Sequence, residues 1–182
     1  MNINNDINNY KGQPPVLCVS GKKNSGKTAL IDSLIPLLLK EGFCTAVIKH
    51  HGHGFGDEIP DTPGTDTYRF LASGAYGAVI YDDDMFSLVK RSPVSAADLV
   101  SLFPEADLVF IEGAKGEPWP RIAMLRAGQP FAYDPESLLC VVTDMEYDRA
   151  SLPPGLLCFD FGDFEPVAKL VIDWLNGARG GT

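Results

Sequence analysis

The chain has 182 residues, and its 15 Lys and Arg against 24 Asp and Glu give a formal net charge of −9. Hydrophobic residues make up 45% and charged residues 21%, a globular composition that excludes an intrinsically disordered chain. Phosphate contacts dominate nucleic-acid affinity, so this acidic balance excludes a general nucleic-acid binder but allows a local phosphate site. The longest apolar stretch, 34–39, is far short of a membrane span, and the N-terminus lacks a signal-peptide pattern. We therefore expect a cytoplasmic protein that contacts neither nucleic acid nor membrane.

The chain predicts one α/β domain over residues 14–178, preceded by a polar, Asn-rich tail at 1–13 that we expect to be disordered. Apolar strands alternate with helices, which favours a mostly parallel sheet covered on both faces. The strand pair at 77–90 breaks this alternation and is interpreted as an antiparallel insertion or a dimer arm. The predicted elements, in chain order, are strand 16–20, helix 27–40, strand 44–49, helix 66–73, strands 77–81 and 85–90, helix 96–103, strands 107–111, 121–126 and 138–142, and helix 164–176.

The turn between the first strand and the first helix matches the phosphate-loop motif G-x-x-x-x-G-K-[ST] at every fixed position. Its glycines let consecutive backbone N–H groups point at a phosphate, and the following helix adds its N-terminal dipole. Lys27 is expected to reach the β- and γ-phosphates, and the Thr28 hydroxyl is a magnesium ligand. The predicted nucleotide-binding residues of this segment are Gly21, Lys22, Lys23, Asn24, Ser25, Gly26, Lys27, Thr28 and Ala29.

Lys22 and Lys23 are unusual in such a turn. A lysine at the second position resembles the deviant Walker A loop of ParA/MinD-type ATPases, in which it acts across a dimer interface. The alternative is a solvated lysine that adds positive potential near the phosphates. Both interpretations place the loop against phosphate.

A second loop follows the strand at 44–49 and contains all three histidines of the chain, His50, His51 and His53. Such a cluster could bind a metal, but a metal also needs a rigid ligand frame, and three glycines in 52–56 make the loop flexible. We therefore favour contact with an anionic ligand through Lys49 and His50. The question of metal binding by the histidines stays open at this point.

Four segments taken together resemble the MobB family, the molybdopterin-guanine dinucleotide biosynthesis adaptor protein B. They read GKKNSGKT, IKHHGH, DTPGTDTYRFLASGA and DLVFIEGAKGEPWPRIAMLR, and the match runs in order from residue 16 to about 144. The resemblance departs from the usual family pattern at Ala29 and Ala114, and residues 83–103 are the least similar part. It implies a dimeric P-loop NTPase-type three-layer fold that binds GTP, with weak GTPase activity at most. It also implies partnership with the MobA guanylyltransferase and contact with molybdopterin or its guanylated form.

Acidic residues at strand ends and in the second loop complete the predicted site. Glu112 directly follows the strand at 107–111, at the place where a P-loop fold carries its magnesium-facing carboxylate. The resemblance to the family's Glu-Gly-x-Lys pattern adds Lys115 to the predicted ligand-binding residues. With Lys27, the candidate catalytic residues are Asp61 and Asp66, either of which could orient magnesium or water. Asp66 could instead cap the helix that follows, and Arg69 could pair with Asp66 or with a phosphate.

Asp144 follows the buried strand at 138–142, at the place where GTP-binding P-loop proteins carry N/T-K-x-D. The lysine of that motif is missing here, so Asp144 is either a reader of the guanine base or an acid in a strand-end turn. GTP and Mg²⁺ are the predicted ligands. A P-loop small-molecule kinase and a deviant Walker A ATPase are the competing functions, and the kinase is ranked lower because the arginines form no clustered lid.

Overall fold

The computed structural model describes residues 13–179 except 53 and 115, and this part of the chain forms two compact units. The sheet unit comprises the residues up to His50 and from Ala96 onward, and the hairpin unit comprises His51–Ser95. Of the predicted tail, residues 1–12 lie outside the described residues. Gln13 is described, and its side chain donates a hydrogen bond to Ser101 Oγ at 2.7 Å.

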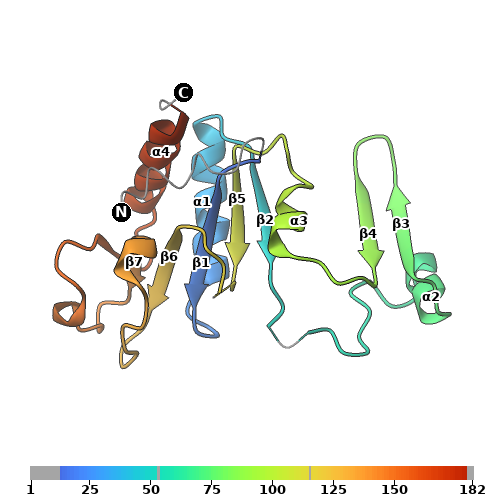
Figure 1. The fold of residues 1–182 in the computed structure, drawn as a ribbon, viewed down its shortest axis with the longest axis horizontal. Helices are drawn as coiled ribbons and strands as arrows, with labels where there is room; N and C mark the ends of the chain where they lie inside the picture. The colour runs from blue at the N-terminus through green and yellow to red at the C-terminus, as the bar shows by residue number, and fades with distance from the viewer. Residues whose placement is uncertain (1–12, 53, 115, 180–182) are drawn as a thin grey trace. The chain divides into compact units, whose positions relative to one another are not determined.

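The strands of the sheet unit form one six-stranded sheet within the described residues, in the order β2-β5-β1-β6-β7-β8 (Figure 1). Every neighbouring pair in this sheet is parallel, which confirms the predicted α/β class. The elements are β1 (Val16–Gly21), α1 (Lys27–Lys40), β2 (Thr45–Lys49), α3 (Ala96–Val100), β5 (Leu108–Glu112), β6 (Arg121–Leu125), β7 (Leu138–Thr143), β8 (Cys158–Asp160) and α4 (Glu165–Arg179).

The sheet is the middle of three layers, as predicted, with helices and loops packed on both of its faces. Alternate residues of the central strands, such as Leu17 and Val19, pack with α1 and α4 in one buried cluster. The opposite residues, such as Val16 and Cys18, pack with Val100 of α3 in a second cluster. Loops after β6 and β7 cover the rest of that face in a third cluster. Because both faces are covered, the strands are continuous apolar runs.

Two features of the sheet differ from the expectation from sequence. The predicted sheet is covered on both faces, but β2 lies at its edge, and only Ile48 of the five residues of β2 is buried. The strand β8 was not predicted, because its three residues, which pair with β7, are too few to show a hydrophobic period. None of the helices in the described residues combines the length and hydrophobicity needed to cross a membrane.

The hairpin unit contains α2 (Asp66–Ala72) and the antiparallel pair β3 (Gly77–Tyr81) and β4 (Phe86–Lys90), which confirms the predicted strand pair. The capping role considered for Asp66 is wrong. Thr65 is the N-cap, because its hydroxyl accepts a hydrogen bond from the Tyr68 N–H at 3.2 Å. Asp66 is instead the first residue of α2, where a negative charge favours the helix dipole.

Candidate nucleotide-binding site

The predicted phosphate loop joins the buried end of β1 to the first turn of α1. Asn24 and Gly26 adopt left-handed backbone conformations, with φ of 62° and 89°, and the Ser25 N–H donates to the Lys22 carbonyl at 3.2 Å. Asparagine and glycine are the residues that adopt this conformation at the lowest cost. The backbone therefore curls tightly just before α1, as the motif predicts.

Lys27 lies across this loop. Its Nζ donates to the Gly21 carbonyl at 3.2 Å and to the Lys22 carbonyl at 2.8 Å. Phosphate oxygens are charged acceptors and form stronger hydrogen bonds with an ammonium group than neutral carbonyls do. The position of Lys27 is therefore suited to exchanging loop carbonyls for a phosphate. Lys22 and Lys23 are exposed beside it and add positive charge.

Three side chains from different elements meet at the carboxyl end of the sheet. The Thr28 hydroxyl, in the first turn of α1, donates to Glu112 Oε2 at 3.0 Å. The same oxygen lies 3.5 Å from Nζ of Lys49, which ends the neighbouring strand β2. Glu112 is 8% exposed, whereas the Lys49 side chain is 64% exposed. The structure thus brings together three residues that were predicted for the site from separate segments of the chain, of which Thr28 and Glu112 are 84 positions apart.

The chemistry of this group fits magnesium. A hydroxyl and a carboxylate are hard oxygen ligands, and Mg²⁺ commonly uses one or two protein ligands with phosphate oxygens and water. The described residues contain no group of three or more His, Cys, Asp or Glu that could hold a metal by themselves. A magnesium ion held by Thr28 and Glu112 would therefore depend on a bound nucleotide for its remaining ligands.

The other predicted residues of the sheet unit lie at the same edge. His50 continues the sheet beyond β2, because its N–H donates to the Glu112 carbonyl at 3.0 Å. Ala29 is exposed in the first turn of α1. Asp144 follows β7, and both of its carboxylate oxygens accept from the Ala127 N–H at 3.2 Å. Lys115 lies outside the described residues.

Arg126 also lies at this edge, although its place in the site was not predicted from the sequence. It follows the last residue of β6, and its Nη2 donates to the carbonyl of Ser25 in the phosphate loop at 2.6 Å. Its guanidinium carbon lies 3.7 Å from the centroid of the Phe161 ring, just beyond β8. The only available signal was its place at the carboxyl end of a predicted strand beside the loop.

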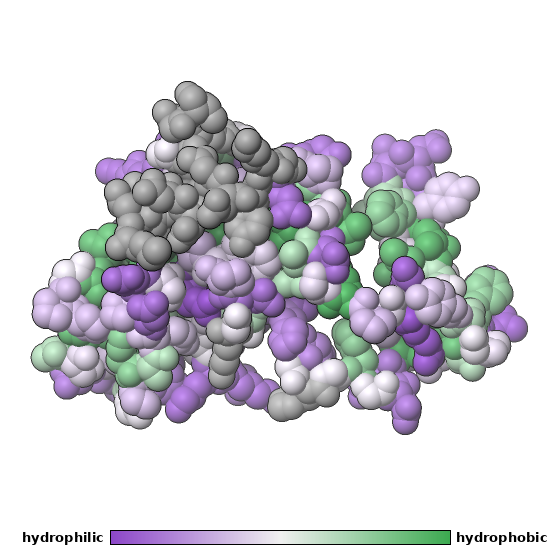
Figure 2. Space-filling view, viewed as in Figure 1, coloured by the Kyte–Doolittle hydropathy of each residue, from purple (hydrophilic) through white to green (hydrophobic). Residues whose placement is uncertain are grey.

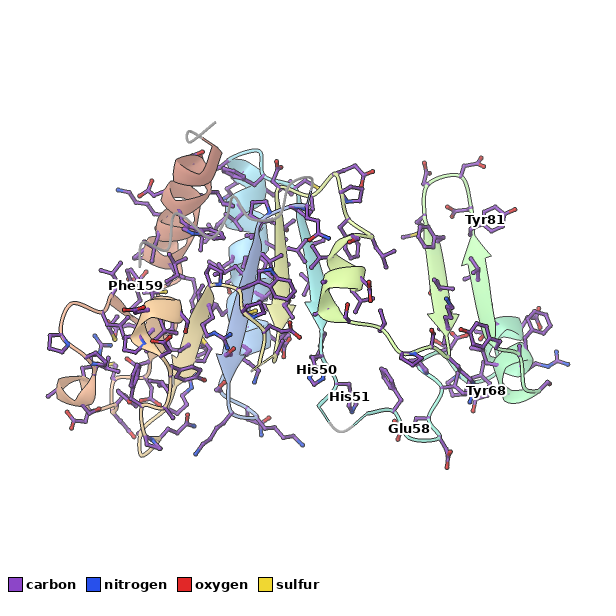
Figure 3. The ribbon with its side chains drawn as sticks, viewed as in Figure 1. His50, His51, Glu58, Tyr68, Tyr81 and Phe159 are labelled. Atoms are coloured by element: carbon purple, nitrogen blue, oxygen red, sulfur yellow. The ribbon has the colours of Figure 1, made fainter. Side chains whose placement is uncertain are left out.

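The remaining candidates belong to the hairpin unit. Asp61 Oδ1 accepts from the Thr62 N–H at 2.7 Å, and Asp66 pairs with Arg69 at 3.4 Å, with both side chains exposed. The proposed catalytic and ligand-binding roles of these three residues therefore stay predictions. The His51 ring (Figure 3) lies 5.0 Å from the Phe55 ring of the same unit, measured between centroids, with the two planes inclined at 49°. His53 lies outside the described residues. Metal binding by the histidine cluster is untested.

The hairpin unit also contains an open cavity of about 590 Å³. Its lining combines aromatic rings, carboxylates and apolar side chains from the loop before α2 and from α2 itself, namely Phe55, Asp57, Glu58, Ile59, Pro63 and Tyr68 (Figure 3). Asp61 and Asp66 are not among these residues. The cavity therefore gives no support to a catalytic role for either aspartate.

Known proteins with similar sequences belong to the family that the phosphate loop and the fold indicate. The family model described as molybdopterin guanine dinucleotide synthesis protein B matches residues 16–144. The chain belongs to the MobB family. The molybdopterin-guanine dinucleotide biosynthesis adapter protein of Haemophilus influenzae is 31% identical over 176 residues, which cover 92% of this chain and 93% of that protein. Its Escherichia coli counterpart is 29% identical over 178 residues, covering 91% of this chain and 96% of that protein.

A solved structure supports the same family assignment. The crystal structure of Bacillus subtilis MobB superimposes with a TM-score of 0.68 at 27% identity and covers 88% of this chain and 97% of that chain. The match extends over nearly the whole MobB fold. The chain is thus a MobB-family protein, and this family acts in molybdopterin guanine dinucleotide biosynthesis.

Proposed function

We propose that the protein is a GTP-binding accessory protein of molybdopterin guanine dinucleotide biosynthesis with weak GTPase activity. The observation that supports this most directly is the hydrogen bond of Thr28 to the nearly buried Glu112, at the mouth of a phosphate loop that contains Lys27. This pair is what a P-loop protein needs to hold Mg²⁺ beside the β- and γ-phosphates of a nucleotide. The hydroxyl and the carboxylate would hold the ion, which would neutralise phosphate charge and polarise a phosphoryl oxygen.

The accessory role is proposed from the names of the relatives, which are adapter proteins of this biosynthesis. The partner would be a MobA-type guanylyltransferase, and the delivered molecule molybdopterin or its guanylated form, in the cytoplasm. GTP turnover should be measured alone and with that partner. A rate that rises with the partner supports the accessory GTPase, and phosphate binding without any turnover supports a purely structural adaptor. Phosphoryl transfer to an added small-molecule acceptor would favour the kinase alternative.

Base choice gives the first prediction. If Asp144 meets the base, it accepts from guanine N1–H and the exocyclic amine, whereas adenine presents an acceptor at N1 that the carboxylate repels. We expect GTP to bind better than ATP by at least about 1.4 kcal/mol, one decade in affinity. Asp144→Asn should reduce this preference and leave the phosphate contacts intact, as measured by calorimetry with both nucleotides.

The contact of Asp144 with Ala127 leaves lone pairs for a base, because one N–H shared by two oxygens occupies one acceptor site on each. Equal affinity of the unmodified protein for ATP and GTP would make Asp144 a turn residue only. That result would strengthen the deviant Walker A ATPase interpretation, for which the exposed Lys22 is the supporting residue.

Assembly gives the second prediction. On one face of the hairpin, Val79 and Tyr81 lie opposite Leu88 and Phe86, and all four side chains are between 49% and 79% exposed. Figure 2 shows hydrophobic side chains, in green, at the surface of this unit. A two-stranded sheet is marginal alone, and exposed apolar strands with unpaired edges need covering. We therefore propose that the hairpin forms a homodimer interface.

Light scattering at micromolar concentration should give the mass of two chains. Replacing Phe86 and Leu88 together by lysine should lower the mass to that of one chain, because two charges would then face an apolar contact. Replacing Lys169, an exposed residue of α4, by methionine is the control and should leave the dimer intact. A monomeric mass for the unmodified protein would refute the interface.

A further inference from the structure

One arginine at the carboxyl end of β6 contacts the phosphate loop. Arg126 follows β6 and is half-buried, and its Nη2 donates to the Ser25 carbonyl at 2.6 Å. Ser25 is itself buried and precedes the left-handed Gly26. The contact joins residues that are 101 positions apart. It is a direct link between the loop and the end of β6, next to Ala127, which contacts Asp144 after β7.

An aromatic ring just after β8 holds the guanidinium in this position. The Arg126 guanidinium lies 3.7 Å above the Phe161 ring, and Phe161 makes an edge-to-face contact with Phe164 at 5.4 Å. The Phe161 N–H also donates to the Thr143 carbonyl at 2.7 Å, at the end of β7. An arginine stacked on an aromatic face gains cation–π energy and loses little rotamer freedom when it donates.

The backbone next to Arg126 is fixed as well. Ala127 donates its N–H to the Asp144 carboxylate, and the Gln129 N–H donates to the Arg126 carbonyl at 3.0 Å in a tight turn. The Arg126 side chain is thus held by the ring contact, and its backbone lies in a tight turn beside the contact of Ala127 with Asp144. These contacts restrain both the side chain and the backbone of Arg126.

We infer that Arg126 is a positioning residue of the nucleotide site, an assignment that rests on the GTP-binding function proposed above. The Ser25 carbonyl and the Gly26 N–H belong to the same peptide unit, and in a trans peptide these two groups point in opposite directions. Because Arg126 holds the carbonyl from the side of β6, the Gly26 N–H is directed away from it. Arg126 thereby orients one of the amides that cradle the phosphates.

The space at Gly26 agrees with this close fit. A Cβ atom at position 26 would lie 2.5 Å from the Phe161 ring and 2.6 Å from Arg126 Nη2. Arg126 and Phe161 therefore lie so close to the loop that only glycine fits at position 26 without a displacement. This close packing against the loop backbone agrees with a role of Arg126 in holding the loop.

The test compares nucleotides and variants. Arg126→Met keeps much of the side-chain length but removes the donors and the charge, so GTP and ATP should both bind about tenfold more weakly, the loss of one charged hydrogen bond. The ratio of their affinities should not change, in contrast to Asp144→Asn. Arg126→Lys keeps a donor and the charge without the planar stack, and should recover about half of the loss in logarithmic terms.

Two further measurements keep the test independent of folding defects and of nucleotide identity. Hydrogen exchange of the Gly26 amide in the nucleotide-free protein should accelerate in Arg126→Met. Phe161→Leu removes the ring beneath the guanidinium, together with its edge contact with Phe164, but keeps the Arg126 donors, and should weaken the binding of both nucleotides about threefold. Lys169→Met removes one exposed positive charge from the same unit and should change neither measurement.

The contradicting results are distinct from those that would defeat the proposed function. If the unmodified protein binds GTP and Arg126→Met binds it equally well, the inference fails and the GTP-binding function stands. If the unmodified protein binds no nucleotide, the function fails, and unchanged exchange at Gly26 would then also refute the role of Arg126. A change in the GTP-to-ATP ratio in Arg126→Met would refute positioning of the phosphates in favour of contact with the base.

Discussion

Replacing Lys27 by alanine is expected to weaken GTP binding by about 2–3 kcal/mol, the scale of a hydrogen bond to a charged group. Nζ of Lys27 reaches back to the carbonyls of Gly21 and Lys22 at the start of the loop, so its ammonium group is held against the loop. A phosphate bound without it would keep more of its negative charge uncompensated. Isothermal titration calorimetry of both proteins measures the difference directly.

Lys169→Ala is the matched control for this experiment, because Lys169 is exposed on α4 and its loss changes the net charge by the same amount. It should leave the GTP affinity within experimental error. An affinity for Lys27→Ala equal to that of the unmodified protein would contradict the assignment of the phosphate loop.

The second large effect is expected from Gly21→Ala at the end of β1. A Cβ atom at this position would lie 2.8 Å from the Met124 carbonyl oxygen and 2.4 Å from Ser25 Oγ. The first of these atoms belongs to the backbone of β6, the strand paired with β1, so it cannot turn aside as a side chain could. Overpacking of this kind lowers the free energy of unfolding by about 1–3 kcal/mol. Chemical denaturation followed by circular dichroism gives the value.

Gly177→Ala is the appropriate comparison, because a Cβ atom at that position on α4 has nothing within 4 Å. Alanine also favours a helix more than glycine does, so this variant should be as stable as the unmodified protein or slightly more stable. If Gly21→Ala were equally stable, the close approach of the loop to β6 would be wrong.

The local motifs of the sequence predicted the part of the site that is contiguous in the chain. The spacing of Gly21, Gly26 and Lys27 determines where the loop curls, and the alternation of strands and helices gives the parallel sheet. Because parallel strands end at one edge, the meeting of Thr28 with Glu112 also followed from the predicted topology. These inferences needed only short-range patterns and a fold class.

Other features depend on tertiary contacts that leave no local pattern. The arginine that holds Ser25 comes from a strand end 101 residues away, and one arginine among several has no distinguishing spacing. The edge position of β2 was not evident, because the apolar composition of an edge strand resembles that of a central one. Whether Thr65 or Asp66 caps α2 depends on a shift of one residue in the helix start, and sequence patterns do not define helix ends to one residue.

The most direct test of a magnesium-dependent GTP site is a calorimetric titration of the unmodified protein and of Glu112→Gln with GTP, in Mg²⁺ and in EDTA. Glutamine keeps the shape of the side chain and removes the charge that faces Thr28 and Lys49. The unmodified protein should bind GTP more tightly in Mg²⁺, and Glu112→Gln should lose most of that difference while still binding in EDTA. No GTP binding by the unmodified protein, or the same gain from Mg²⁺ in both proteins, would contradict the account.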